Sequence, residues 1–360
     1  MILTTMDRHI IMRTLFAYVF LIMVLIIFFV LIHYLEHIDD FLDHNASLRK
    51  IYLIYYPSYI PSIIEQVSPL ALFLAAIFTT SRLAQSLQMT ALQTGGVSLQ
   101  RLSFPYLLLG IFVSTLMFIV GGWISPHTNQ TVLSYDDLYI KGRNQQIYVS
   151  EIHRRNDPSS VVTVGYFDRR TKTAHRVQLQ QFGPDGSLIE RVDGQQMVWR
   201  DSLWHFSYAT VRSFKSGHEE RQIITPLDTV LLVFPRDLAR SVRDIESMTI
   251  PIATDYIAAL QRSGLADTGR DMVGYFSMFA YPFTNLIAML IALPLTYRRR
   301  RGGQAVQIGL GLLIAFVYLT AQKLTEPFGY TGELPPLLAV VLPHSAFLFG
   351  SLIALVIARK

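Results

Sequence analysis

Cysteine is absent from all 360 residues, which excludes disulfides, thiolate metal sites and cysteine nucleophiles. Charge is also scarce, because only 16% of the residues are charged whereas 51% are hydrophobic. A soluble globular domain carries about 25% charged residues. We therefore expect a membrane protein rather than a water-soluble one.

Three common signatures of catalysis are missing as well. The chain contains no GxxxxGKS/T phosphate loop, no HExxH pair and no GxSxG elbow, which excludes the usual nucleotide-binding, zinc-hydrolase and serine-hydrolase sites. The apolar runs also lack the paired acids or the His/Asp pair of an intramembrane protease or acyltransferase. We predict that the chain is not an enzyme. If it performs directional work, an ion gradient or a separate ATPase must drive it.

Long apolar runs, in contrast, are abundant. A helix needs roughly 18 or more mostly apolar residues to cross about 30 Å of hydrocarbon. Six runs qualify, although the second also contains Glu65. The first run is too long for a secretory signal and no small-residue cleavage site follows it. We therefore predict six transmembrane helices at 14–32, 51–80, 106–124, 272–297, 305–322 and 334–358.

Charged residues outside the segment 127–271 differ between the two ends of these helices. One face has ten Lys and Arg residues against a single acid, Asp7, whereas the other has three basic and seven acidic residues. An excess of Lys and Arg marks the cytoplasmic face. We therefore predict that both termini, the 81–105 loop and the 298–301 loop are cytoplasmic. The basic residues lie beside the helices rather than on one soluble surface, which argues against nucleic-acid binding.

The segment between the third and fourth predicted helices is typical of a β domain. Short runs rich in β-branched and aromatic residues alternate with turn sequences such as “GPDGS” and “KSGHEE”. This spacing predicts a sandwich, jelly roll or open barrel rather than βαβ units. The runs are 145–152, 161–167, 176–181, 187–191, 196–200 and 204–214.

These elements predict a membrane α-helical fold of six transmembrane helices with an inserted, jelly-roll-like all-β domain on the external side. The predicted domains are helices one to three in 1–126, the β domain in 127–250, and a connecting helix with helices four to six in 251–360. Interior prolines kink helices, and Pro282 and Pro294 lie in the fourth predicted helix.

The stretch “SRLAQSLQMTALQTGG” (81–96) lies between the second and third predicted helices. Leu83, Leu87 and Ala91 fall on one helical stripe, and Gly95 and Gly96 follow as a C-cap signal. We expect a short cytoplasmic helix along the membrane surface. From the residues alone, it is either an interfacial anchor or a docking helix for a motor subunit.

Two further features allow a functional and a structural interpretation. His33 and His37 are spaced four apart, so with Asp40 or His44 they match a metal-site spacing, but such residues are also ordinary where a helix leaves the membrane. Glu65 is the one charged residue within a predicted transmembrane helix. It is a candidate for a proton-relay or substrate role, although a position in the outer half of its helix also permits a plain interfacial role.

Five stretches, in this order, resemble the lipopolysaccharide-export permeases of the LptF/LptG type. The resemblance covers nearly the whole chain, and the first, fourth and fifth stretches are more similar to the LptG branch than to the LptF branch. The stretches are “MDRHI”, “RLAQSLQMTALQTGGVSLQRL”, “GGWISP”, “SGLADTGRDMVGY” and “LPPLLAVVLPHSAF”.

The resemblance implies a non-catalytic permease subunit of an ATP-driven ABC transporter in the bacterial inner membrane. Such a transporter extracts lipopolysaccharide from the outer leaflet and passes it to a periplasmic bridge toward the outer membrane. Removing several acyl chains, at about 0.8 kcal/mol per methylene, is uphill and requires an ATPase. The chain itself would hold no cofactor, because ATP and Mg would bind to the ATPase.

The implied partners share the work of export. They are a second six-span permease (LptF-like), a cytoplasmic ATPase dimer (LptB-like), a single-span bridge component (LptC-like) and a soluble periplasmic bridge protein (LptA-like). The β domain would be periplasmic and form one piece of the bridge.

The resemblance also implies two sets of site residues. The ATPase would grip a coupling helix at about 82–95, through Arg82, Gln85, Leu87, Gln88, Met89 and Leu92. The first and fifth spans of the paired permeases would form lateral gates around a substrate cavity. Its candidate residues are Phe29, His33, Tyr34, His37, Glu65, Phe316 and Tyr318.

Two positions depart from the family pattern. Gln88 stands where family members usually carry an acidic residue that pairs with the ATPase, which leaves a neutral hydrogen bond instead. The outer end of the first span is acidic rather than basic, so the positive charge for lipid phosphates would come from the partner permease, from Arg49 and Lys50, or from divalent cations.

A membrane-anchored ligand sensor or scaffold is the alternative function. Six spans exceed what an anchor needs, and the glycine-capped cytoplasmic helix would then lack a purpose. Co-purification with an ATPase and a second permease distinguishes a transporter subunit from a sensor.

Overall fold

The computed structural model describes residues 4–44, 46–140, 152–157, 159–168, 171–215, 218–238, 245, 247–263, 268–297 and 303–358. The chain divides into two compact units. The helical unit comprises Met1–Gly142, Glu246–Ala253 and Gly269–Lys360, and the β unit comprises Arg143–Ile245 and Thr254–Thr268. The helix of the third span continues past the membrane length to Ile140.

The helical unit contains most of the helices, three of them short π-helical segments (η). The first half of the chain contributes α1 Thr5–Glu36, α2 Ile38–Asp43, α3 Leu48–Lys50, η1 Ile51–Tyr55, α4 Tyr56–Gln85, α5 Gln88–Thr94, α6 Leu99–Ile119, η2 Val120–Ile124, α7 Ser125–Tyr135 and η3 Asp136–Ile140. The second half contributes α10 Gly269–Ala280, α11 Phe283–Thr296, α12 Gly303–Tyr330 and α13 Pro336–Ala358. The predicted connecting helix is α9, Ile250–Ser263.

The predicted count of six spans is confirmed when one bent pair is taken as a single span. Among the described residues, five helical segments are long and apolar enough to cross a membrane: Thr5–Glu36, Leu48–Gln85, Leu99–Ile140, Gln304–Tyr330 and Pro336–Ala358. The remaining span consists of α10 and α11, and the chain bends by 53° between these two helices. The break falls at Tyr281 and Pro282, where proline has no amide hydrogen to continue the helix.

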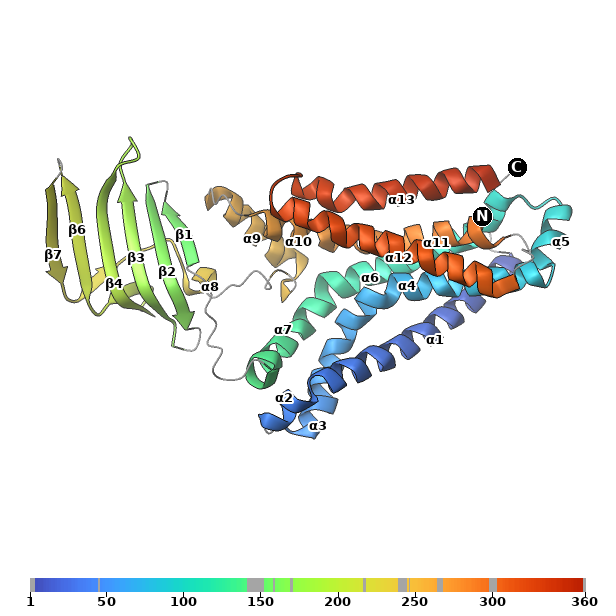
Figure 1. Cartoon of the computed structure of the whole chain (residues 1–360), viewed down its shortest axis with the longest axis horizontal. Coiled ribbons are helices and arrows are strands. Elements are labelled where there is room, and N and C mark those ends of the chain that lie inside the picture. Colours follow the sequence, from blue (N-terminus) through green and yellow to red (C-terminus); the bar gives the residue numbers. More distant parts are fainter. Residues whose placement is uncertain are drawn as a thin grey trace. The chain divides into compact units, whose positions relative to one another are not determined.

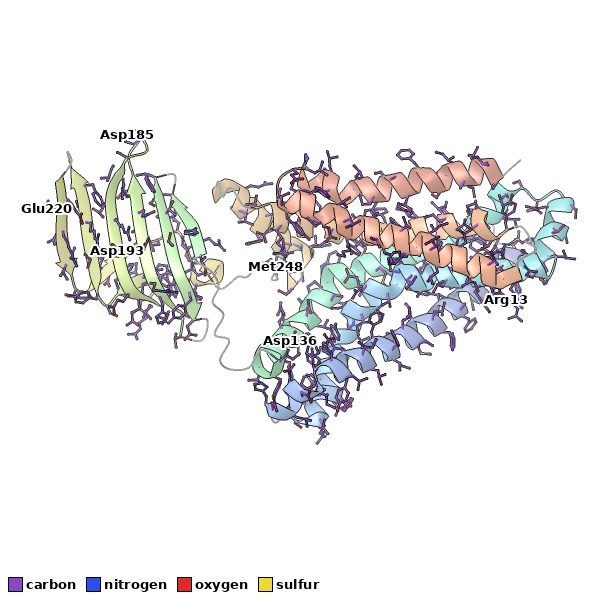
Figure 2. All side chains as sticks on the ribbon, in the orientation of Figure 1. Arg13, Asp136, Asp185, Asp193, Glu220 and Met248 are labelled. Atoms are coloured by element: carbon purple, nitrogen blue, oxygen red, sulfur yellow. The ribbon has the colours of Figure 1, made fainter. Side chains whose placement is uncertain are left out.

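The start of α1, the end of α13 and the short helix α5 lie at the same end of the helical unit (Figure 1). We name this the inner end, and the opposite end, with α2 and α3, the outer end. Figure 2 shows Arg13 toward the inner end and Asp136 at the outer end. The start of α1, the end of α13 and α5, which the charge pattern assigns to one face of the membrane, therefore lie close to the same end of the helical unit.

The core of the helical unit is built mainly from α4, α6 and α11. In the most apolar 18-residue window of the second span, the buried share is 56%, whereas in that of α1 it is only 6%. Phe16, Phe20 and Ile27 of α1 are all more than 60% exposed. Because α1 is so apolar and yet so exposed, it must face lipid or a partner helix along most of its length.

The β unit is one eight-stranded, wholly antiparallel sheet, so the predicted absence of βαβ units is confirmed for the described residues. The path runs β1-β2-β3-β4-β5-β8, while β6 pairs with β4 and β7 pairs with β6. The strands are β1 Ile152–Asp157, β2 Ser160–Asp168, β3 Thr173–Phe182, β4 Leu188–Arg200, β5 Leu203–Phe206, β6 Ala209–Lys215, β7 His218–Ile224 and β8 Leu227–Thr229.

The strand predictions are wrong around β4, where two different strands pair with the same edge of one strand. The predicted runs 187–191 and 196–200 are one strand, β4, whose first half pairs with β6 and second half with β5. Hydrogen bonds from β3 on the other edge hold the “VDGQQ” segment extended, although its composition favours a turn. The predicted run 204–214 is instead divided into β5 and β6. Of the run 145–152, only Ile152 lies within the described residues, and it begins β1.

An apolar core stabilises the β unit on one face of the sheet. Trp204 is fully buried between β-sheet valines and the segment after β8, and its indole Nε1 donates to the Val233 carbonyl oxygen at 2.7 Å. The turn “GPDGS” is confirmed between β3 and β4, where Gly186 has φ 78° and Asp185 accepts from the Ser187 hydroxyl at 2.7 Å.

Candidate functional site

The loop between the second and third spans contains a helix break. α4 ends at Gln85, and Leu87 has left-handed backbone angles, φ 61° and ψ 6°. The Ser86 hydroxyl donates to the carbonyl oxygens of Arg82 at 3.0 Å and Leu83 at 3.2 Å, which closes the end of α4. The predicted helix over 82–95 is thus two helices, because a left-handed residue cannot continue an α-helix and costs about 1–2 kcal/mol.

The break also changes which side chains are buried. Leu83 and Met89 are fully buried in the helical core, but Leu87 is 51% exposed. The predicted stripe of Leu83, Leu87 and Ala91 is therefore wrong, because the left-handed turn at Leu87 resets the helical periodicity. The Met89 side chain anchors α5 to the core, and Leu87 is left at its surface.

The other predicted coupling residues also differ in burial. Arg82 and Gln88 are exposed, and Leu92 packs partly against the core. Gln85 is half-buried, and its Nε2 atom has no hydrogen-bond partner among the described residues. A buried amide donor without a partner costs about 1–3 kcal/mol.

The predicted C-cap at the end of α5 is confirmed. Gly96 has φ 86°, the Gly96 amide donates to the Gln93 carbonyl at 3.0 Å, and the Val97 amide donates to the Leu92 carbonyl at 3.0 Å. These are the two hydrogen bonds of a Schellman motif. A positive φ is nearly free for glycine, so α5 ends in a defined direction before α6 begins.

The outer end of α1 gathers the predicted gate residues into an aromatic cluster. The rings of His33 and His37 stack 4.4 Å apart with 1° between their planes. Tyr34 lies against Tyr52, with centroids 5.7 Å apart. Three tyrosine rings of η1 and α4 surround His33 at centroid distances of 4.9 to 6.0 Å: Tyr55, Tyr56 and Tyr59. We call these side chains the tyrosine cluster.

One strong hydrogen bond ties the tyrosine cluster to the third span. The Tyr55 hydroxyl donates to Asp136 Oδ1 at 2.7 Å, and Tyr55 is 1% exposed. By contrast, the contacts of His33 with the hydroxyls of Tyr55 and Tyr56 are both 3.5 Å, at the limit of a hydrogen bond. The histidine is therefore held mainly by ring packing.

The histidine spacing does not assemble a metal site in the described residues. His37 Nδ1 lies 3.2 Å from the His33 carbonyl oxygen and His44 Nδ1 lies 2.9 Å from that of Asp40, so both nitrogens bond to the backbone. No group of three or more potential ligands converges in this part of the chain or elsewhere among the described residues. The geometry favours the interfacial interpretation of this segment.

Glu65 lies at the contact between α4 and η2. A Cβ atom at Gly121 would stand 2.5 Å from Glu65 Oε1, so only glycine allows the carboxylate to approach η2 this closely. Glu65 is half-buried there. A proton-relay or substrate role for this carboxylate stays a prediction.

The remaining gate residues face different surroundings. Phe29 and Phe316 are 37% and 66% exposed, whereas Tyr318 is 3% exposed. The Tyr318 hydroxyl lies 2.8 Å from His344 Nδ1, and its ring packs against Phe347 at 4.5 Å. Phe316 therefore lies on the outer surface of α12, whereas Tyr318 joins α12 to α13.

Sequence reasoning missed an ion pair at the inner end. The Arg101 guanidinium donates to both oxygens of Asp7, at 2.8 Å and 2.5 Å, and Asp7 is 4% exposed. Thr4 and Asp7 also form a capping box that begins α1. The sequence does indicate such a pair, since Asp7 is the single acid on a face with ten basic residues.

A comparison with protein families finds a match over most of the chain. The family described as lipopolysaccharide export system permease LptF/LptG matches residues 8–357, which is nearly the whole chain. A comparison with curated proteins gives no match.

Proposed function

The chain belongs to the LptF/LptG family of lipopolysaccharide export permeases, and from this membership we propose that it converts ATP hydrolysis by a partner into extraction of lipopolysaccharide. The family consists of permease components of the lipopolysaccharide-export ABC transporter, and the helices of this chain make it a multi-pass membrane protein. The finer steps proposed here are docking of the ATPase on α5, opening of the α1 and α12 gates, and passage of lipid to the β unit.

The proposed docking of the ATPase is supported by the way in which α5 is held against the core. The helix is fixed to the core by Met89 and by the Schellman motif, so force applied to it is transmitted to α4 and α6. Gln88 of α5, Leu87 immediately before it and Arg82 near the end of α4 are exposed at the inner end. An exposed leucine held in a strained backbone suits an apolar contact with the ATPase. Gln88 supplies a neutral hydrogen bond where the family usually has an acid.

Three changes in α5 test this step. Leu87→Asp places a charge in the apolar contact, and we expect loss of lipopolysaccharide-stimulated ATPase activity in the reconstituted assembly. Leu87→Asn also accepts the left-handed backbone, so its failure would show that the side chain and not the backbone turn makes the contact. Gln93→Glu, on the exposed side of the same helix, is the matched control and should leave coupling unchanged. Intact coupling in Leu87→Asp would refute ATPase docking on α5.

Photo-crosslinkers test the gate. Groups placed at His33 and Phe316 should label lipopolysaccharide, since His33 lies at the outer end of α1 and Phe316 lies at the middle of α12, exposed on its surface. Leu342 is 51% exposed in the outer half of α13 and serves as the control for plain contact with the bilayer. Labelling at Leu342 that equals the labelling at both gate positions would contradict the gate.

The orientation follows from the same proposal. Both ends of the chain and α5 are placed in the cytoplasm, and the β unit in the periplasm of a cell with an inner membrane. Because the chain has no cysteine, single cysteines at Arg82 and Asp185 report the two sides without background. A membrane-impermeant maleimide added outside should label only the cysteine at 185. We also propose that the chain is LptG-like and pairs with an LptF-like permease. Co-purification of that partner and the ATPase with this chain distinguishes a transporter subunit from a sensor or scaffold.

A further inference from the structure

Several contacts between buried polar side chains join the spans of the helical unit, among them Ser81 with Gln307 and Thr80 with Tyr106. Two networks of such contacts meet at neighbouring residues of α11. Their members are all less than 9% exposed: Tyr18, Ser68, Thr284, Asn285, Tyr318, Gln322 and His344. In hydrocarbon a polar group has no water to bind, so it is kept in place by its protein partners. These contacts therefore define which helices hold each other in position.

The first network reaches α1. The Tyr18 hydroxyl of α1 lies 2.7 Å from Ser68 Oγ of α4, and Ser68 donates to Asn285 Oδ1 of α11 at 2.8 Å. Since Ser68 donates to Asn285, the Tyr18 hydroxyl donates to Ser68. The chain Tyr18–Ser68–Asn285 thus links α1, through α4, to the first turn of α11.

The second network reaches α12. Gln322 Nε2 of α12 donates to Thr284 Oγ1 of α11 at 3.2 Å and lies 3.4 Å from His344 Nδ1 of α13. The Tyr318 hydroxyl, also of α12, lies 2.8 Å from the same His344 nitrogen. An amide nitrogen only donates, so His344 Nδ1 is the acceptor in both contacts. Thr284 therefore holds α12 in the way that Asn285 holds α1.

Thr284 and Asn285 directly follow the break in the fourth span. Asn285 Nδ2 donates to the Pro282 carbonyl oxygen at 3.3 Å, one of the groups at the 53° bend. On the other side of the break, the Lys323 ammonium of α12 lies 5.2 Å above the Tyr281 ring. A bent helix pair is an element that can change its angle. Here the bend is bonded to α12 directly and to α1 through Ser68 of α4.

We propose that the break at Tyr281–Asn285 is a coupling node that makes α1 and α12 move together, so that the two gates of this subunit open and close as one. This inference rests on the proposed function, because the two helices are its gates. Thr284 and Asn285 act as positioning residues and not as lipid contacts. A change that loosens one gate helix from the node must then alter the other, which it does not touch.

Distances between spin labels test the coupling in the assembled transporter in nanodiscs, with its ATPase and partner permease made cysteine-free. One label pair joins Leu31 of α1 to Ile119 of α6, and the other joins Leu324 of α12 to Ile119; all three side chains are exposed. Ser68→Ala removes the hydrogen bonds that link α1 to Asn285, and Gln322→Leu removes the hydrogen bond of α12 to Thr284. Both variants keep the separate contact of Gln307 in α12 with Ser81 in α4. Coupling predicts that each variant changes both distances. For the label pair on the gate helix that the variant does not contact, the ratio of the open to the closed population should shift roughly ten-fold.

Thr296→Val is the matched control. Thr296 is a buried threonine of the same helix α11, but its hydroxyl donates at 2.7 Å to Ala292 of its own helix. It should leave both distances unchanged. Tyr18→Phe and Thr284→Val remove single hydroxyls and serve in place of any variant that does not assemble.

The outcomes separate the two proposals. If ATP shifts neither distance in the wild-type assembly, the proposed gating fails, yet the resting distances still test the node. The node is refuted if each variant alters only the helix it contacts, or if Thr296→Val has the same effect as Ser68→Ala.

Discussion

The two units of the chain use polar side chains in opposite ways. In the helical unit, hydrogen bonds between buried side chains connect different helices, as with Ser68 and Asn285, and Asp7 is 4% exposed in its ion pair. In the β unit the hydrophobic core includes the Trp204 indole, whose Nε1 donates to a backbone carbonyl, and the pair of His205 and Asp228 lies at the surface, with side chains 30% and 55% exposed. Removing a buried polar side chain should therefore move helices in the first unit, whereas removing His205 or Asp228 should change little in the second.

The largest effect is expected from Asp7→Ala. It leaves Arg101 without its carboxylate and also removes half of the capping box at the start of α1. Thr4→Ala removes only the cap and costs about 1 kcal/mol, so Asp7→Ala should lower the thermal unfolding midpoint of the purified permease further. The exchange Asp7→Arg with Arg101→Asp restores opposite charges and should recover part of the loss. Equal midpoints for Asp7→Ala and Thr4→Ala would show that the ion pair contributes nothing.

A second prediction changes only packing in the helical unit. A Cβ atom at Gly311 of α12 would stand 2.0 Å from Ile77 Cδ1 of α4, and Ile77 is fully buried. Gly311→Ala should therefore destabilise the permease by about 1–3 kcal/mol, as overpacking does. Gly309→Ala, two residues away, meets nothing within 4 Å and should be neutral or slightly stabilising. The two melting curves measured side by side check this, and equal shifts would contradict the close packing of α12 on α4.

The third prediction concerns the outer end of α1. Tyr55→Phe removes the hydrogen bond to Asp136, and hydrogen bonds to charged groups contribute about 1.5–3 kcal/mol. A double-mutant cycle with Asp136→Ala isolates the pair. We expect the two losses of stability to be clearly non-additive, whereas additive losses would mean that the bond does not join η1 to η3.

The smallest effect is expected in the β unit, from the pH dependence of His205. The carboxylate of Asp228, 2.6 Å from Nδ1, raises the pKa of the imidazole. Its stabilisation is thus fully present below the ordinary histidine pKa of about 6.5 and is lost as pH rises through the raised value. Amide exchange of β5 and β8, corrected for intrinsic rates, should show slightly less protection at the higher pH, and His205→Gln should remove the difference. The same pH dependence in His205→Gln would assign it elsewhere.

Periodic and compositional signals predicted the architecture because they depend on many residues at once. Six apolar runs correspond to the helical spans, and turn glycines such as Gly96 and Gly186 have the positive φ that their positions required. Pro282 lies at the break of the fourth span for the local reason that proline has no amide hydrogen.

Features that depend on one backbone angle or on distant pairing were not predicted. The left-handed Leu87 divides a segment that has continuous helical periodicity. The fork at β4 depends on which strands hydrogen-bond to it, and composition does not carry that information. Asn285 and His344 belong to networks between residues far apart in sequence, so single polar residues in apolar runs carried no signal of their partners.

Release of lipopolysaccharide from proteoliposomes is the most direct test of the central claim, that this chain couples ATP hydrolysis to lipid extraction. Vesicles should contain the ATPase and the second permease, with and without this chain, and the lipid released would be measured against the ATP consumed. We predict release only when both ATP and this chain are present. Release without this chain, or release that does not depend on ATP, would contradict the account.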